Sequence, residues 1–126
     1  MDYKKLYERI MSVHPNIRFV TIVDTEGRLM AGGQRNGISN YLTPEEERQS
    51  IRHAIDAWRL RTIFTGSIGN GKYSLTEYEK IKRITLPIDN QHLIYMTAEV
   101  DVNHTFIINE ILKIVEMYGK AVKQVS

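Results

Sequence analysis

A glycine-rich segment that ends in a lysine is the part of this sequence that comes closest to a nucleotide site. Gly66, Gly71 and Lys72 have the spacing of a phosphate-binding loop. The Ser or Thr that such a loop carries after its lysine is replaced by Tyr73. A phosphate-binding loop also follows a strand and opens a helix, whose amides and dipole hold the phosphate. This segment follows a predicted helix and leads into a predicted strand, so we interpret it as a helix stop and a turn.

Acidic and histidine side chains lie close together in the sequence at Glu99, Asp101 and His104. Strand alternation directs Glu99 and Asp101 to one side, beside the start of the next helix. A divalent cation is one interpretation of this group. The other, which we favour, is an acidic helix start stabilised by the helix dipole.

Other chemistry has no support in the residue pattern. The four histidines show no i, i+4 pair of the kind that prepares a zinc site. The absence of cysteine excludes disulfides, thiolate metal sites and a cysteine nucleophile. No serine lies in a nucleophile elbow. We therefore predict that the protein is not an enzyme and has no catalytic residue, no cofactor and no metal.

Basic side chains form another group of residues that could bind a partner. Six of them are candidates for a basic face: Arg48, Arg52, Arg59, Lys80, Lys82 and Arg83. The three arginines share one helix face by 3.6-residue geometry, and the other three form a run in a later strand. Such a face suits a nucleic acid or an acidic membrane surface, but Glu45 and Asp56 stand within a turn of the arginines, and the net charge is only +2. We therefore regard a solvated helix face as the better interpretation and nucleic-acid binding as disfavoured.

The elements in the first part of the chain follow from its hydrophobic periodicity. An apolar stripe at i, i+3, i+4 and i+7 predicts a helix from Tyr3 to Ile10, which Pro15 stops. Apolar residues on both faces of Ile17 to Val23 predict a strand covered on both sides. A turn at 24–27 joins it to a second strand, 28–31, and we expect Gly32 and Gly33 to end the pairing.

The second half begins with the strongest local signal in the chain. Thr43, Pro44 and Glu46 predict a helix start with a capping box. We expect its buried face to comprise Ile51, Ala54, Ile55 and Trp58, continued by Leu60, Ile63 and Phe64 up to a run of glycines. Strands are predicted at 72–78, 81–88 and 92–100, with Pro87 at a strand end or edge. Asn103 is expected to cap a last helix with an unusually wide apolar face.

Length and composition predict one soluble domain, residues 1–126. The 42% hydrophobic and 25% charged residues are those of an ordinary globular protein. The polar first residues show no signal peptide, and no apolar run approaches the ~18 residues of a membrane span. We expect a cytoplasmic location.

These elements predict an α+β fold, a five-stranded antiparallel sheet with flanking helices in the order α-β-β-α-β-β-β-α. This order, with the hairpin IRFVTIVDTEGRLMAGG (Ile17 to Gly33), resembles the roadblock, or dynein light-chain, class of the profilin-like superfold. The segments EYEKIKRITLPID and HLIYMTAEVDVNH also resemble an uncharacterised family of small archaeal proteins. The long fourth strand with Pro87 and the charged run EYEKIKR depart from the roadblock pattern.

The resemblance to roadblock proteins implies a non-catalytic protein-interaction module, a homodimeric regulatory scaffold whose partner is a small GTPase or a signalling component. It implies a dimer formed through the second helix and a sheet edge. The candidate interface residues are Leu29, Ala31, Ile51, Ile55 and Trp58. Two alternatives stay open: a small-ligand sensor of the PAS or GAF kind, with aromatic residues around a cavity, and a nucleic-acid or membrane-surface binder that uses the basic face.

Overall fold

A computed structural model describes residues 2–125 of the chain, and side-chain surroundings up to Gly119. Residues 1 and 126, which belong to the predicted domain 1–126, lie outside the described residues. The elements in chain order are α1 (Tyr3–Met11), β1 (Ile17–Asp24), β2 (Leu29–Gln34), α2 (Pro44–Arg61), the 3-10 turn η1 (Thr62–Phe64), α3 (Thr65–Ile68), β3 (Ser74–Glu77), β4 (Ile81–Pro87), β5 (His92–Glu99) and α4 (His104–Val125).

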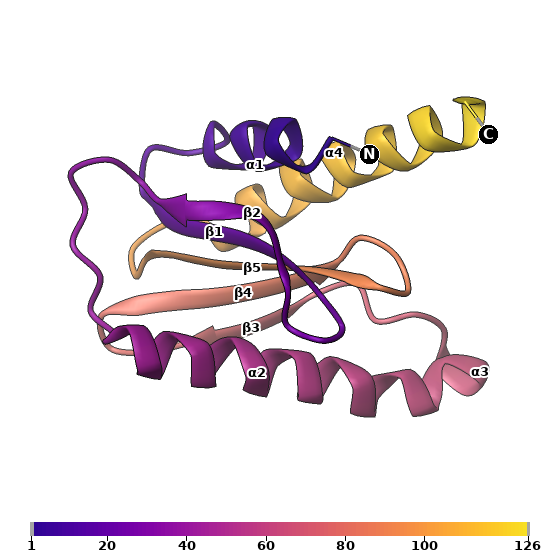
Figure 1. Cartoon of the computed structure of the whole chain (residues 1–126), viewed down its shortest axis with the longest axis horizontal. Helices are drawn as coiled ribbons and strands as arrows, with labels where there is room; N and C mark the ends of the chain where they lie inside the picture. Colours follow the sequence, from indigo (N-terminus) through magenta and orange to yellow (C-terminus); the bar gives the residue numbers. More distant parts are fainter. Residues whose placement is uncertain (1, 126) are drawn as a thin grey trace.

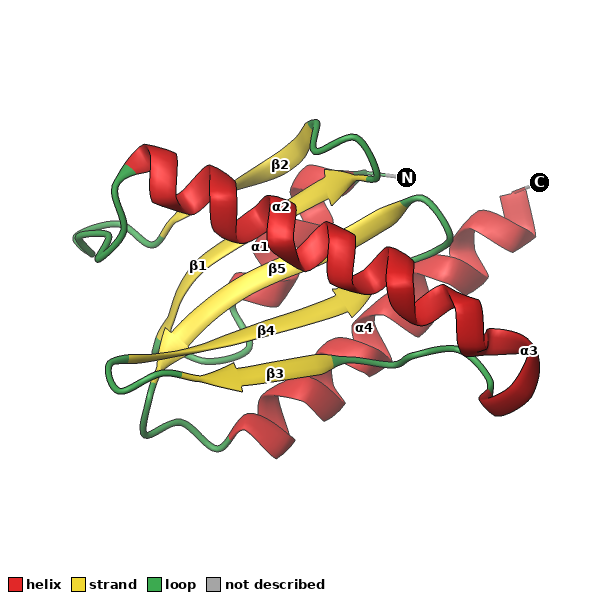
Figure 2. Cartoon of the chain, turned by 90° about the horizontal axis from the view of Figure 1, so that it is seen from below, coloured by secondary structure: helices red, strands yellow, loops and turns green. Residues whose placement is uncertain are grey.

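The strands form a single sheet in the order β2-β1-β5-β4-β3, and every neighbouring pair is antiparallel. Helices α1 and α4 cover one face of this sheet, and α2 crosses the other face (Figures 1 and 2). The predicted α+β architecture and element order are confirmed. Strands β2 and β3 are the two edges of the sheet, a fact that the order along the chain does not reveal.

The N-terminal part forms for the reasons expected from the sequence. Asp2 caps α1 by accepting a hydrogen bond from the Lys5 amide at 3.1 Å. Gly27 lies in the left-handed region (φ +84°) in the turn between β1 and β2, where a side chain would be strained.

The expectation that Gly32 and Gly33 end the β1–β2 pairing is wrong. Gly32 lies opposite Thr21, and Gly33 lies opposite Val20, so β2 continues to Gln34. A Cβ atom on Gly32 would lie 2.7 Å from the Cα of Thr21. Glycine is therefore needed here because the two strands approach closely, and it does not interrupt the strand.

Helix α2 begins with the predicted capping box. The Thr43 hydroxyl accepts a hydrogen bond from the Glu46 amide at 3.1 Å, and the Glu46 carboxylate accepts one from the Thr43 amide at 2.9 Å. The hydrogen bond from the Thr43 backbone amide to the carboxylate is the main cause that holds the pKa of Glu46 below its usual value of 4.5. The helical path runs on through η1 and α3, past Gly66, and ends at Gly69 with φ +86°.

The last three strands are somewhat shorter than predicted. Strand β3 pairs with β4 only from Ser74 opposite Thr85 to Glu77 opposite Lys82. Pro87 is the last residue of β4, beyond the part that pairs with β3, which agrees with its expected position at a strand end.

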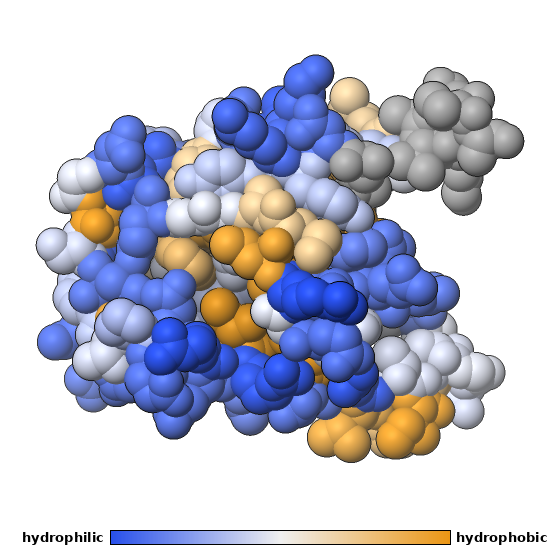
Figure 3. Space-filling model, in the orientation of Figure 1, coloured by the Kyte–Doolittle hydropathy of each residue, from blue (hydrophilic) through white to orange (hydrophobic). Residues whose placement is uncertain are grey.

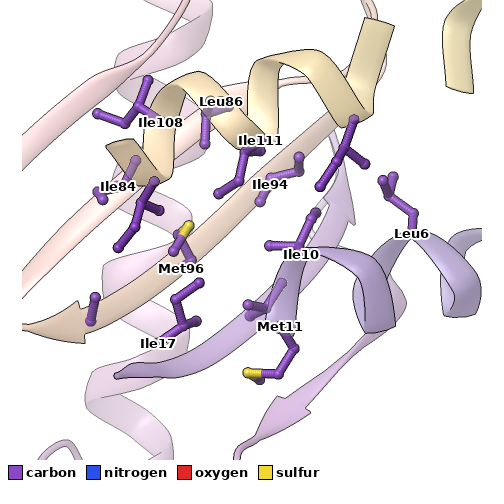
Figure 4. Close-up of a cluster of buried hydrophobic side chains, with 14 of the residues drawn as sticks. Leu6, Ile10, Met11, Ile17, Ile84, Leu86, Ile94, Met96, Ile108 and Ile111 are labelled. Carbon is purple, nitrogen blue, oxygen red and sulfur yellow. The ribbon is translucent and has the colours of Figure 1, made fainter. Parts of the chain in front are cut away.

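The sheet separates two hydrophobic layers of different size. The larger layer lies between the sheet and helices α1 and α4, and includes Leu6, Ile10, Ile94, Met96 and Ile111 (Figure 4). Under α2, the smaller layer has six buried members among the described residues: Phe19, Val23, Ala54, Ile55, Leu93 and Tyr95. Helix α2 is therefore attached to the sheet by far less apolar contact than α4.

Candidate interaction surfaces

Helix α2 leaves the half of its sheet face near β3 and β4 uncovered. Two hollows lie along this side of the helix, with volumes of about 550 Å³ and about 640 Å³. Both are within the size range of small-ligand sites, roughly 300–1,000 Å³. We call them the C-terminal and the N-terminal groove, after the end of α2 that each one borders.

The N-terminal groove has a hydrogen-bonded floor. The Tyr95 hydroxyl lies 2.7 Å from Ser50 Oγ, and Arg83 Nη1 donates to the same oxygen at 3.2 Å. Burial raises the pKa of Tyr95 above its usual 10.0, so this hydroxyl stays neutral at physiological pH. Tyr41 and Tyr78 line the groove nearer the surface. Arg83 thus brings a half-buried positive charge to this floor, where it donates a hydrogen bond to the neutral Ser50 hydroxyl.

The C-terminal groove contains the end of the glycine-lysine segment. Gly71 and Lys72 line it together with Trp58, Pro87 and Leu93. The segment leaves α3 and enters β3, as predicted, so no helix begins after Lys72 to present amides to a phosphate.

At the end of α2, the apolar residues do not lie on the side of the helix that was predicted to be buried. Trp58, Arg61, Thr62 and Thr65, spaced i, i+3, i+4 and i+7, line the C-terminal groove. The expected continuation of the buried face through Leu60, Ile63 and Phe64 is wrong, because helical geometry turns these residues to the opposite side. With Ile68 they form an exposed group that we call the apolar tip: Leu60 (65% exposed), Ile63 (72%), Phe64 (56%) and Ile68 (82%).

The five predicted interface residues lie in different environments. Leu29 is 64% exposed on the open edge strand β2, and Ala31 is half-buried in the same strand. Ile55 is completely buried against the sheet, so in this structure its side chain belongs to the core of one chain. Ile51 and Trp58 are half-buried and pack on the same layer. Sheet edge β2 and the groove beside Trp58 are therefore separate surfaces.

The six basic candidates do not gather on one face. Arg48 pairs with Glu45, and Arg59 lies 3.6 Å from the Glu26 carboxylate. The other helix arginine, Arg52, donates to the Glu26 carbonyl oxygen at 3.1 Å.

In β4 and its preceding turn, Lys82 is separated from the other two basic residues. Lys82 is buried, and its Nζ donates to the Val102 carbonyl oxygen at 2.8 Å. Arg83 lies on the opposite face of β4, in the N-terminal groove, and Lys80 lines the same groove, with its Nζ over the ring of Tyr41. The sequence could not show this separation, because it depends on which face each strand turns to each helix.

The acidic and histidine group near residue 100 is likewise dispersed. Glu99 pairs with Arg18, and His104 Nδ1 lies 3.0 Å from Lys82 Nζ. Among the described residues, no group of three His, Asp or Glu side chains could hold a metal ion. Within residues 2–125, no helix is both long enough and apolar enough to cross a bilayer.

A family model described as a family of unknown function (DUF6659) matches residues 2–125. The chain belongs to this family. The match accords with the expected resemblance to an uncharacterised family, and the resemblance to archaeal proteins stays a prediction. No curated protein sequence matches the chain.

Solved structures match the fold over nearly the whole chain. A Roadblock/LC7 domain from Streptomyces avermitilis is 10% identical with a TM-score of 0.71, covering 98% of each chain. MglB from Myxococcus xanthus is 11% identical with a TM-score of 0.73, covering 98% of this chain and 99% of its own. Profilin IA from Acanthamoeba castellanii is 9% identical with a TM-score of 0.64, covering 94% and 98%. The predicted roadblock and profilin-like fold is confirmed, and at these identities the likeness concerns the fold alone.

Proposed function

We propose that this protein is a non-catalytic interaction module, a homodimeric regulatory scaffold of the roadblock type. The observation that carries the proposal is the open sheet: among the described residues, β2 and β3 are both edge strands and each pairs with a strand on one side only. Such edges readily pair with another chain, and a two-fold contact is the commonest form of self-association. One structure of similar fold, MglB, is described as having a tetrameric arrangement, which supports the proposal that this chain also self-associates.

The proposed dimer uses α2 and one sheet edge. Leu29 and Ala31 are the candidates on β2, and Ile51 and Trp58 are the half-buried candidates on α2. Ile55 holds α2 on the sheet and contributes to the interface only by fixing the position of the helix. A small GTPase or a signalling component is the proposed partner of the dimer, on the strength of the resemblance alone.

Analytical ultracentrifugation of two matched variants tests the dimer and its edge. Leu29→Lys adds a charge at the β2 edge, and Tyr73→Lys adds one immediately before β3, replacing a side chain that is 53% exposed. We expect the wild type to sediment as a dimer and Leu29→Lys as a monomer, with Tyr73→Lys unchanged. The reverse pattern would move the interface to β3, and a wild-type monomer at high concentration would contradict the proposal.

The partner requires a separate test, because a dimer can form without it. A small GTPase from the same organism, loaded with either GDP or a GTP analogue, is titrated against the purified dimer. We expect binding that prefers one nucleotide state. Equal binding in both nucleotide states, or no binding, would contradict the proposal of a GTPase partner without affecting the proposal of a dimer.

A small-ligand sensor is the second candidate function, and the N-terminal groove favours it. A half-buried guanidinium beneath two tyrosines suits a small anion with an aromatic or planar group. A thermal-shift screen with aromatic carboxylates tests this function, with Arg83→Gln as the matched variant. Stabilisation that disappears in Arg83→Gln would support the sensor, and no stabilisation by any compound would count against it.

A further inference from the structure

Two Asn-Gly pairs occur in this sequence, at Asn36 and Gly37 and at Asn70 and Gly71. Asparagine is thermolabile, and it converts to aspartate most readily before a glycine. The next backbone nitrogen must attack the side-chain amide, and glycine has no Cβ atom to hinder that approach. Both pairs meet this local requirement, so a difference in rate between them in the folded protein depends on how the structure holds each pair.

The first pair is fixed in a closed turn. The Ile38 amide donates to the Arg35 carbonyl oxygen at 3.1 Å, and Gly37 has φ +81°. Arg35 is itself anchored, because its amide donates to the Arg18 carbonyl oxygen at 2.8 Å and its side chain donates to three other carbonyl oxygens. The turn sets the peptide plane between Asn36 and Gly37, and the attack on the side chain has to rotate that plane.

The second pair lies in an open segment. Asn70 and Gly71 are both exposed and belong to no helix or strand, since α3 ends at Ile68 and β3 begins at Ser74. Within the described part of the chain, neither the Asn70 side-chain amide nor the Gly71 amide has a hydrogen-bond partner. A Cβ atom on Gly71 would meet nothing within 4 Å beyond its chain neighbours. The attacking nitrogen is therefore free, and little around it resists the rotation.

This open segment borders the C-terminal groove. It leaves α3 at the projecting lower right of the molecule, where hydrophobic side chains adjoin weakly polar ones (Figures 1 and 3). Besides Asn70, the lining of the groove includes the charged residues Arg61, Lys72 and Asp89. The Asp89 carboxylate already has a partner, His92 Nδ1 at 2.9 Å. A carboxylate at position 70 would give the lining two acids and two cations, which lowers the attraction of the groove for anions.

We propose that Asn70 is a site of spontaneous deamidation, which converts one side chain of the C-terminal groove from a neutral amide to a carboxylate. The site uses neither the sheet edges nor the N-terminal groove. It therefore stands apart from the proposed dimer and from the proposed sensor.

The conversion needs water and no other reactant. The Gly71 nitrogen forms a bond to Asn70 Cγ, while the bond from Cγ to Nδ2 breaks and that nitrogen leaves as ammonia with the proton of the Gly71 amide. Water then opens the resulting ring at one of its two carbonyl carbons. The product is aspartate when the new bond is broken, and isoaspartate when the original main-chain bond is broken.

Incubation of the folded chain at mildly alkaline pH, followed by peptide mass spectrometry, tests the proposal. We expect Asn70 to convert at least about fivefold faster than Asn36, because the first pair must open its closing hydrogen bond before the attack. The same incubation in concentrated urea is the matched control. Both pairs are then released from the fold, and we expect their rates to become similar.

Two variants identify the attacking nitrogen and the product. Gly71→Ala fits the structure, since Gly71 has no positive φ and has room for a Cβ atom. It should keep the thermal transition of the wild type and slow conversion of Asn70 at least about fivefold. Asn70→Asp carries the charge of the aspartate product and should elute with it on ion exchange.

Three outcomes would overturn the proposal. One is a rate at Asn70 in the folded chain that is no higher than the rate at Asn36. Another is a difference that persists unchanged in urea, which would assign the preference to the neighbouring residues and not to the fold. The third is an unchanged rate in Gly71→Ala, which would replace ring closure by direct hydrolysis of the amide.

Discussion

Arg35 joins three segments of the chain at one guanidinium group. Its Nε donates to the Ile17 carbonyl oxygen at 2.7 Å, and its Nη2 donates to those of Met11 and His14 at 2.6 and 2.9 Å. The end of α1, the loop after it and the start of β1 are thus held together by a residue that immediately follows β2. The residue pattern gave no sign of this role, because all three acceptors are main-chain oxygens.

Replacement of Arg35 by Met should therefore destabilise the protein. The methionine keeps most of the apolar stem but removes the Arg35 donor from three carbonyl oxygens, of which that of His14 keeps the Ile17 amide as a donor at 3.2 Å. We therefore expect a loss of about 2–3 kcal/mol in the free energy of unfolding. Urea unfolding followed by circular dichroism measures it. The control is Arg9→Met on the exposed side of α1, which should change the value by less than about 0.5 kcal/mol. Equal effects of the two substitutions would contradict the role assigned to Arg35.

Asp24 organises the turn between β1 and β2. Its carboxylate accepts hydrogen bonds from the amides of Glu26 and Arg28, both at 2.9 Å, and from Arg28 Nε at 2.8 Å. The pKa of Asp24 lies below its usual 3.8, mainly because the carboxylate accepts a hydrogen bond from the Arg28 backbone amide. Desolvation of the carboxylate raises the pKa by a smaller amount.

This lowered pKa predicts the sign of an acid-dependent effect. The folded state favours the ionised form of Asp24 more strongly than the unfolded state does. The ionised carboxylate therefore makes its full contribution to stability above the unfolded pKa of 3.8, and this contribution is lost as the pH falls through the folded pKa. Asp24→Asn keeps an oxygen acceptor without the charge. We expect the variant to lose less stability than the wild type between neutral and acidic pH, as measured by thermal unfolding across that range. Parallel pH profiles for the two proteins would refute this.

At the scale of elements, two glycines have different surroundings, and we predict opposite effects on stability when each is replaced by alanine. Gly32 in β2 faces the backbone of β1, where a Cβ atom would lie 2.7 Å from Thr21 Cα and 2.8 Å from the Val20 carbonyl oxygen. Gly66 in α3 has no atom within 4 Å of the corresponding position. Only the first position is limited by contact with another strand.

Gly32→Ala should destabilise the protein by about 1–3 kcal/mol, because β1 and β2 must move apart. Gly66→Ala should leave stability unchanged or raise it by up to about 1 kcal/mol, since alanine restricts the unfolded chain and favours a helix. Thermal unfolding of both variants provides the comparison. A neutral Gly32→Ala would mean that the edge strand β2 shifts at little energetic cost.

Over the whole molecule, the unequal layers predict unequal local stability. Helix α2 rests on six buried residues, while α1 and α4 share a much larger cluster with the sheet. Segments with few buried contacts open at lower free energy than the whole domain. We expect amide hydrogen exchange in α2, and in η1 and α3 after it, to be faster than in the part of α4 that packs on the sheet.

Substitution of Ile55 tests this difference directly. Ile55→Ala removes a fully buried side chain from the smaller layer and should accelerate exchange in α2 more than in α4. Ile111→Ala, in the larger layer, is the matched control and should accelerate exchange throughout the chain. Hydrogen exchange followed by mass spectrometry measures both. If Ile55→Ala accelerated exchange uniformly, α2 and the sheet would form one cooperative unit.

Mobility of α2 also bears on the proposed interfaces, since both grooves adjoin this helix. A partner that binds only the docked position of α2 would stabilise it, and protection of α2 would rise on binding. The same exchange experiment with a bound partner therefore reports on the contact that it makes with α2.

The sequence by itself determined the main helices and strands and their order, because these depend on local signals, and the resemblance to roadblock proteins indicated the fold that they form. The capping box at Thr43, the turn at Gly27, the alternation in β1 and the stripe of α4 involve neighbours along the chain, and each is present as predicted. The same local signals excluded a phosphate-binding loop at Lys72, because they showed that this segment follows a helix and enters a strand, whereas a phosphate-binding loop follows a strand and enters a helix.

Only the tertiary structure decided which surfaces are free. The sequence interpretation assigned Leu60, Ile63 and Phe64 to a buried face, but they lie on the side of α2 that faces away from the sheet and are exposed. Lys82 and Arg83 are adjacent in sequence, yet one is buried beside α4 and the other lies in a groove beside α2, because neighbouring residues of a strand point to opposite faces. Burial and charge pairing depend on contacts between distant segments, and those contacts are set by the packing of helices on the sheet.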